Sequence, residues 1–200
     1  MQILSLFQAG GLVMYALLAA SIIVLAIAAE RISVYRRAKT NMEVLKSHLP
    51  KLLAAENYEG ALALCQDAGG IVGELLANAI KHRNYVCNPC EFLAGQAQEA
   101  AGRLKENLNY VSAIVTLAPL MGLLGTVIGM IGSFNVLTIA EGEPFAVTGG
   151  VAEALIATAF GLLVAIMAMI VFVFLQQVAN KRIADIEVGT TLYSTSVKRF

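Results

Sequence analysis

A single carboxylate, that of Glu153, lies within a long apolar run and is the side chain whose chemistry stands out most. Glu153 is the only ionisable residue between Glu143 and Lys181. A charged side chain inside a membrane segment is costly unless it faces water, pairs with another group or takes up a proton. Because desolvation favours the protonated form, we interpret Glu153 as a proton-exchanging group.

A structural role for Glu153 stays open at this stage. The residue follows Glu143 by ten positions, so its side chain could reach water at the outer interface of the membrane instead of exchanging protons. In that case Glu153 would be a structural group near the outer surface of the membrane.

Small and weakly polar residues gather on one face of each of two apolar segments. At about 100° per residue, they fall within an arc of about 80° on an α-helix. Such faces allow close helix packing, and their hydroxyl groups can also bond to carbonyls of their own helix. The first face holds Pro119, Gly122, Thr126, Gly129 and Ser133, with Gly125 and Gly132 on the adjoining edge. The second face holds Gly150, Ala154, Ala157, Gly161, Ala165 and Ala168, with Glu153 and Thr158 at its opposite margins.

The composition indicates that these helices lie in a bilayer. The chain is 58% hydrophobic and 14% charged, with a mean hydropathy of +0.73. A membrane-spanning helix needs about 20 mainly apolar residues, and three segments meet this requirement. We therefore predict an all-α integral membrane protein with transmembrane helices at residues 10–30, 110–137 and 147–175.

The distribution of basic residues predicts the orientation. Ten of the 14 lysines and arginines lie between the first and second spans, and the other four follow the third. The positive-inside rule then places segment 1–9 and loop 138–146 in the periplasm, and segments 31–109 and 176–200 in the cytoplasm. The formal net charge is zero, which argues against nucleic acid as a partner.

The cytoplasmic segment is predicted to be helical. Amphipathic patterns cover residues 42–54, 58–68 and 73–82, with interruptions expected at Pro50, at Gly69 with Gly70, and at Pro89. From Glu91 no residue breaks the helical pattern before Pro119, so one long helix is expected to rise into the second span. The third helix is expected to extend beyond its span through Ile183 and Ile186.

The sequence offers little support for other chemistry. Cys87 and Cys90 form a lone CxxC pair, and adding Cys65 and His82 gives four conceivable zinc ligands whose spacing fits no zinc-finger pattern. No metalloprotease, nucleophile-elbow or phosphate-loop motif is present. We therefore expect no cofactor and no enzymatic activity.

Two long motifs resemble the MotA/TolQ/ExbB proton-channel family, and specifically its TolQ/ExbB branch. They are APLMGLLGTVIGMI from Ala118 to Ile131 and GVAEALIATAFGL from Gly150 to Leu162. Glu30 and Arg31, followed by Arg36 and Arg37, also resemble the end of the family's first span.

The resemblance implies a homopentamer in the bacterial inner membrane. Its second and third helices would line a pore around a single-span ExbD- or TolR-like subunit that carries a membrane aspartate. Glu153, Thr126 and Thr158 match the family's proton-path positions. Proton flow would drive work at the cell envelope, such as import through a TonB- or TolA-like effector. The alternative is a non-conducting scaffold subunit in which Glu153 is a structural pairing group.

Overall fold

The computed structural model describes residues 11–139 and 144–197, and every regular element within these ranges is an α-helix. The predicted segment 1–9 and the centre of the predicted loop 138–146 lie outside the described residues. The elements are α2 (Gly11–Arg37), α3 (Met42–Ala54), α4 (Tyr58–Ala68), α5 (Gly70–His82), α6 (Pro89–Lys105), α7 (Leu108–Ile139) and α8 (Pro144–Val197).

The chain divides into two compact units. The apolar unit comprises Met1–Ala29 with Asn107–Phe174, and the bundle unit comprises Glu30–Glu106 with Leu175–Phe200. Among the described residues, the three helices α2, α7 and α8 contain apolar stretches long enough to cross a membrane. The all-helical class with three candidate spans therefore agrees with the prediction from composition.

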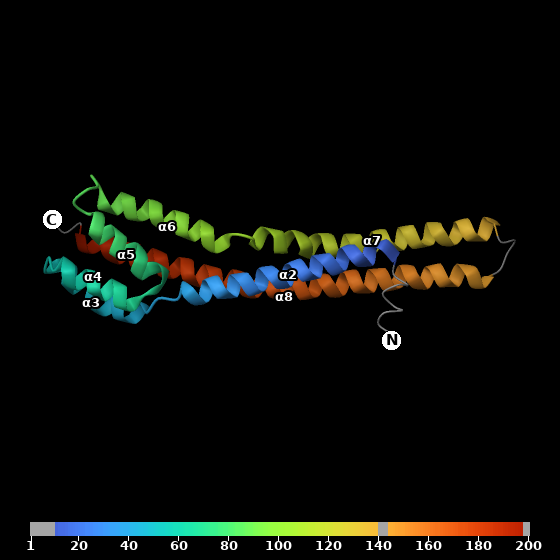
Figure 1. Ribbon diagram of the computed structural model, residues 1–200, viewed down its shortest axis with the longest axis horizontal. Helices are drawn as coiled ribbons and strands as arrows, with labels where there is room; N and C mark the ends of the chain where they lie inside the picture. Colours follow the sequence, from blue (N-terminus) through green and yellow to red (C-terminus); the bar gives the residue numbers. More distant parts are fainter. Residues whose placement is uncertain (1–10, 140–143, 198–200) are drawn as a thin grey trace. The chain divides into compact units, whose positions relative to one another are not determined.

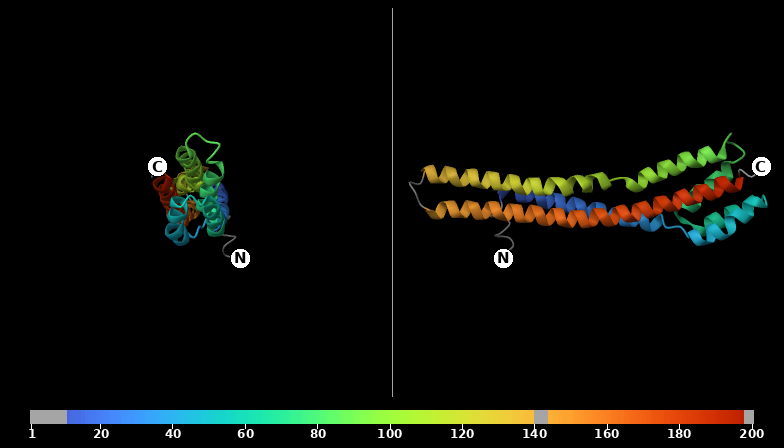
Figure 2. Two further views of the ribbon diagram at one scale, coloured as in Figure 1. Left: turned by 90° about the vertical axis from the view of Figure 1, so that its left-hand side faces the viewer. Right: turned by 180° about the vertical axis from the view of Figure 1, so that it is seen from behind.

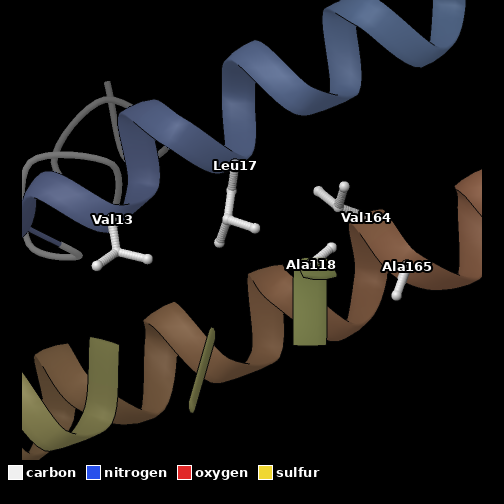
Figure 3. Packing of buried hydrophobic residues seen from close by; sticks show 5 residues of the cluster. All are labelled: Val13, Leu17, Ala118, Val164 and Ala165. Atoms are coloured by element: carbon white, nitrogen blue, oxygen red, sulfur yellow. The ribbon is translucent and has the colours of Figure 1, made fainter. Parts of the chain in front are cut away.

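In the apolar unit, α2, α7 and α8 run side by side (Figures 1 and 2). Val13 and Leu17 of α2 belong to a buried cluster with Ala118 of α7 and with Val164 and Ala165 of α8. Figure 3 shows Val13 and Leu17 pointing from α2 toward α8. A second cluster joins the same three helices through Val24, Val111 and Ala168.

The outward surface of the apolar unit carries large apolar side chains. On α7, Leu120 is 59% exposed and Ile131 is 56% exposed, and on α8, Ile170 is 66% exposed. A soluble domain rarely presents such a continuous apolar surface. The surface fits a surrounding of lipid or of other membrane helices.

In the bundle unit, α3, α4, α5 and α6 pack in sequence order, each against the next. α3 buries Leu45, Leu49 and Leu53 on one face, which is the spacing of an amphipathic helix. Pro50 lies inside α3, so the predicted interruption there is wrong. Proline removes one backbone donor, and the buried leucine face on both sides of Pro50 keeps the helix intact.

The turn between α4 and α5 depends on two glycines. Gly69 has a φ of 60° and Gly70 a φ of 63°, a left-handed conformation that glycine adopts without steric cost. A Cβ atom on Gly70 would also overlap the carbonyl of Lys39. The predicted break at these glycines is therefore present, and it brings the α4–α5 turn against the chain that follows α2.

The expected long helix from Glu91 into the second span is wrong, because α6 ends at Lys105 and α7 begins at Leu108. Glu106 leaves the helical conformation with a ψ of 144°, and Asn107 has a φ of 64°. Asparagine tolerates this left-handed region better than most residues. The start of α6 is conventional, with Pro89 in its first turn and the Asn88 side chain accepting from the Cys90 and Glu91 amides.

The last turns of α8 are held firmly within the bundle unit. Ile186 is buried, as expected for an extension of the third helix, and a Cβ atom on Gly189 would overlap Val72 of α5. Tyr193 is 1% exposed, and burial raises its pKa to about 12.

Nearby, the Arg83 guanidinium lies 4.0 Å from the centre of the Tyr58 ring, a cation–π contact.

The three cysteines differ in their surroundings. Cys65 of α4 is buried, Cys90 is partly buried and Cys87 is exposed, and all three are free thiols. Burial raises the pKa of the Cys65 thiol from 9.0 to about 11. A shift of this size lowers the thiolate fraction roughly a hundredfold, and the thiolate is the reactive form.

We predict that a thiol reagent at mildly alkaline pH modifies Cys87 rapidly in the folded protein and leaves Cys65 unmodified. The measurement compares a Cys87→Ser/Cys90→Ser variant, which retains only Cys65, with a Cys65→Ser/Cys90→Ser variant, which retains only Cys87. Cys65 should become reactive once denaturant is added. Equal labelling rates in the two folded variants would show that α4 does not bury its thiol as described.

Candidate functional site

The two small-residue faces lie against each other within one chain. Successive residues of α7 contact α8 in reverse order along the chain. The contacting pairs are Gly122 with Gly161, Gly129 with Ala154, and Ser133 with Gly150. The two helices are therefore antiparallel neighbours. The contact runs along most of the length that the two helices share.

The backbones of α7 and α8 come close together at Gly122 and Gly161. A Cβ atom on Gly161 would lie 2.7 Å from the Ala118 carbonyl oxygen and 2.9 Å from the Gly122 Cα. A Cβ atom on Gly122 would lie 3.1 Å from both the Ala157 carbonyl oxygen and the Thr158 Cα. The two backbones are thus in direct contact, and neither position has room for a side chain.

Further along α7, the same interface continues with alanine opposite glycine. A Cβ atom on Gly125 would lie 2.7 Å from the Ala157 Cβ, and one on Gly129 would lie 3.1 Å from the Ala154 Cβ. A Cβ atom on Gly150 would overlap the Ser133 hydroxyl. At all five glycines of the predicted site, an added Cβ atom would therefore lie within 3.4 Å of a residue on the opposite helix, and at Gly150 that residue is Ser133.

The hydroxyl groups at the interface do not all play the same role. The Thr158 hydroxyl donates across the interface to the Gly122 carbonyl at 3.0 Å. The Thr126 hydroxyl donates to the Leu123 carbonyl at 2.6 Å, and the Ser133 hydroxyl donates to the Gly129 carbonyl at 2.9 Å, both within α7. Of these three side chains, only Thr158 bonds to the neighbouring helix.

Pro119 lies one residue after the buried Ala118 and is inside α7, which continues through it. Proline lacks a backbone N–H, so it cannot donate to the carbonyl one turn earlier in the helix. Packing of Ala118 against α2 and α8 supports the helix at this point. The structure thus places Pro119 at the end of the small-residue interface nearest Gly161.

The backbone of Glu153 lies in α8, one position before the buried Ala154 and five before Thr158. Its side chain lies outside the described part of the structure.

Sequence reasoning missed the contribution of α2 to this site. A Cβ atom on Gly125 would lie 3.7 Å from the Val13 Cβ, so α2 closes one side of the α7–α8 interface. Val13, Leu17 and Val24 are all buried. Their spacing of four and seven residues places them on one helix face and is the signal that could have identified the contact.

The residues considered as zinc ligands do not form a metal centre in the described part of the chain. No group of three or more histidine, cysteine, aspartate or glutamate side chains that could hold a metal is found there. His82 instead shares a hydrogen bond of 2.9 Å between its Nδ1 and the Asn78 carbonyl. The His82 ring also lies 5.8 Å from the Phe92 ring, measured between centroids.

Comparison with known proteins identifies similar sequences over the site and over most of the chain. Residues 71–188 match the model of the MotA/TolQ/ExbB proton channel family. An ExbB-like biopolymer transport protein of Synechocystis is 34% identical over 180 residues, covering 86% of this chain and 69% of the relative. An ExbB homolog of Methanothermobacter thermautotrophicus is 28% identical over 198 residues, covering 92% of this chain and 67% of the relative. The Tol-Pal system protein TolQ of Pseudomonas aeruginosa is 41% identical over 71 residues, covering 35% of this chain and 31% of the relative.

We predict that Gly161→Ala lowers the stability of the protein, because its new methyl group would lie 2.7 Å from the Ala118 carbonyl oxygen. Overpacking of this kind costs typically about 1–3 kcal/mol. The matched control is Gly132→Ala on α7, since a Cβ atom there meets nothing within 4 Å among the described residues. Thermal unfolding of the purified protein in detergent should show a lower midpoint for Gly161→Ala only. Equal midpoints for the two variants would contradict the close contact.

Proposed function

This chain belongs to the MotA/TolQ/ExbB proton channel family, and on that premise we propose that it is the proton-conducting subunit of an energy-transducing complex in the bacterial inner membrane. The family match extends from α5 into the last turns of α8, which is more than half of the chain. The three apolar helices make the chain a multi-pass membrane protein. Its named relatives are biopolymer transport and Tol-Pal system proteins.

The proposed complex is a homopentamer around a single-span ExbD- or TolR-like partner. In this arrangement the exposed apolar side chains of α7 and α8 face lipid, neighbouring copies and the partner helix. The bundle unit lies in the cytoplasm, as the distribution of lysine and arginine predicts. The driven process would be import or envelope maintenance through a TonB- or TolA-like effector.

The observation that carries the proposal is the hydrogen bond from Thr158 to the Gly122 carbonyl. It places a hydroxyl group between two apolar helices, on the same helix as the membrane carboxylate Glu153. A threonine hydroxyl is one donor and also an acceptor with two lone pairs. While its proton is donated to Gly122, the Thr158 oxygen can still accept a hydrogen bond from a water molecule.

The proposed proton path uses Glu153 as the titrating group and Thr158 as a polar group that orients water beside it. Thr126 contributes a second hydroxyl, half-buried and bonded within α7. The partner's membrane aspartate would be the second carboxyl group along the path. A proton would pass between the two carboxyl groups through water. Each carboxylate would be neutralised when it takes up the proton, which is favoured because an ionised carboxylate is costly in the membrane.

A scaffold role is the second candidate, and the glycine contacts favour it specifically. The α7 and α8 faces are used for packing inside one subunit, so close packing alone explains Gly122, Gly125, Gly129 and Gly161. In that case Glu153 would pair with another subunit without exchanging protons. Proton flux through the assembled complex distinguishes the two candidates.

We predict that Glu153→Gln abolishes most of the proton flux while the complex assembles normally. The substitution retains the shape of the side chain and removes its titration. The measurement is the acidification of proteoliposomes that contain the chain and its copurifying single-span partner. The matched control is Glu187→Gln, which changes an exposed carboxylate on the same helix in the bundle unit and should conduct like the wild type.

Thr158→Val and Thr126→Val should each reduce the flux less than Glu153→Gln, because water can replace a lost hydroxyl contact. Loss of the Thr158 bond is expected to change stability little, since interhelical hydrogen bonds in membranes average about 0.6 kcal/mol. A correctly assembled Glu153→Gln complex with undiminished flux would make Glu153 a structural group and favour the scaffold.

The proposed orientation gives a separate prediction. Single cysteines at Gln2 and Gly142 should react with a membrane-impermeant thiol reagent added outside intact cells, and single cysteines at Lys46 and Lys198 should not. Each variant is made in a background without the three native cysteines. Labelling of the Lys46 and Lys198 positions alone would reverse the orientation.

A further inference from the structure

Three basic residues lie exposed at the end of α2 and just beyond it. Arg36 and Arg37 belong to the last turn of α2, and Lys39 follows in the segment that leads to α3. All three residues are exposed. In the part of the chain that the structure describes, no side-chain hydrogen bond or ion pair involves any of them. We refer to Arg36, Arg37 and Lys39 as the basic patch.

The third arginine of α2 differs from the basic patch. Arg31 is 4% exposed, and its guanidinium donates to the Glu30 carboxylate and to the Arg103 carbonyl. The charge of Arg31 is therefore used inside the bundle unit. The donors of the basic patch, by contrast, are directed to the surface of that unit and are available to a ligand.

No acidic residue offsets the charge of the basic patch within its own segment. Residues 31–42 contain four basic residues and no aspartate or glutamate, although the formal net charge of the whole chain is zero. A local excess of one sign attracts ligands of the opposite sign. The segment therefore favours an anionic ligand.

The sequence places the basic patch next to a membrane surface. The apolar run of the first span ends at Ala29, and Arg36 follows seven residues later in the same helix, which corresponds to about 10 Å. Ile32 and Ala29 lie about one and two turns before Arg36, so the three residues share one helix face. Ile32 is 40% exposed. A face that changes from apolar residues to arginine matches the change from lipid chains to lipid phosphates.

We propose that the basic patch binds the phosphate groups of anionic phospholipids in the adjoining leaflet. A guanidinium offers two parallel N–H donors to a phosphate, and the lysine ammonium adds a point charge. Zwitterionic lipids carry a cation beside their phosphate and should bind less well. Each basic residue near an anionic membrane surface strengthens association about fivefold. The proposal requires only that the chain lies in a membrane, and it holds whether or not the chain conducts protons.

The experiment measures which lipid lies beside the patch. The chain contains no tryptophan, so Ile32→Trp introduces a single fluorescent reporter one turn before Arg36. The full-length protein is reconstituted in phosphatidylcholine bilayers that contain brominated phosphatidylglycerol or brominated phosphatidylcholine, because bromine quenches tryptophan only at short range. The brominated anionic lipid should associate at the reporter at least about fivefold more strongly than the brominated zwitterionic lipid.

The Arg36→Gln/Arg37→Gln/Lys39→Gln variant should lose this preference, so that both brominated lipids quench the reporter equally. The matched control is Lys46→Gln/Lys51→Gln/Lys81→Gln, which removes three exposed cations from α3 and α5 of the bundle unit. This control changes the net charge by the same amount and should keep the preference. A reporter at the exposed Ser33, one turn before Arg37, repeats the comparison if Ile32→Trp does not fold.

Three results would overturn the proposal. The first is equal quenching by the two brominated lipids in the protein with an intact patch. The second is an equal loss of preference in the two triple variants, which would make total charge the cause. The third is loss of the preference when excess soluble glycerol phosphate is added, which would indicate a site for free phosphate instead of lipid.

Discussion

Two membrane helices can bring their backbones together only where side chains are absent, and the contact between Gly122 and Gly161 sets the geometry of the apolar unit. In a bilayer there is no hydrophobic driving force between helices, so close van der Waals packing and interhelical hydrogen bonds hold them together. The same contact brings the Thr158 hydroxyl within 3.0 Å of the Gly122 carbonyl. Larger residues at either glycine would separate the helices and remove that bond.

This constraint also links the apolar interface to the proposed chemistry. A polar group is tolerated between apolar helices when it is hydrogen-bonded, and Thr158 meets that requirement through α7. Glu153 lies on the same helix, five residues earlier, so any movement of α8 against α7 would change the surroundings of both side chains together. The proposed proton exchange and the observed helix packing would therefore both involve α8.

The helices were predictable from the sequence to the extent that their hydrophobic pattern was regular. The leucine spacing of α3 and the paired glycines after α4 indicated those elements correctly. The break at Asn107 was missed because no glycine or proline lies between Gly102 and Pro119. The side chains that bind the last carbonyls of α6, Arg31 and Tyr35, lie about 70 residues earlier in the chain. At Pro50 an interruption was predicted, but α3 continues through it. Burial of the surrounding leucines outweighs the local effect of the proline.

For the site, helical periodicity predicted which small residues share a face, but it did not reveal what that face would contact. The pattern alone allowed a pore lining, an interface between subunits or an interface within one subunit. The three-dimensional structure shows α7 and α8 of one chain in contact, with α2 completing one side through Val13. The role of Glu153 rests on its position in α8 and on the family, and it remains the central proposal.

The measurement that addresses this proposal most directly is the protonation of Glu153 itself. Infrared difference spectra of the assembled complex, with ¹³C-labelled glutamate, report the carbonyl stretch of a protonated carboxylic acid. We expect such a band from Glu153 that decreases as the pH is raised and is missing in Glu153→Gln. Identical spectra for the wild type and Glu153→Gln at every pH would contradict it.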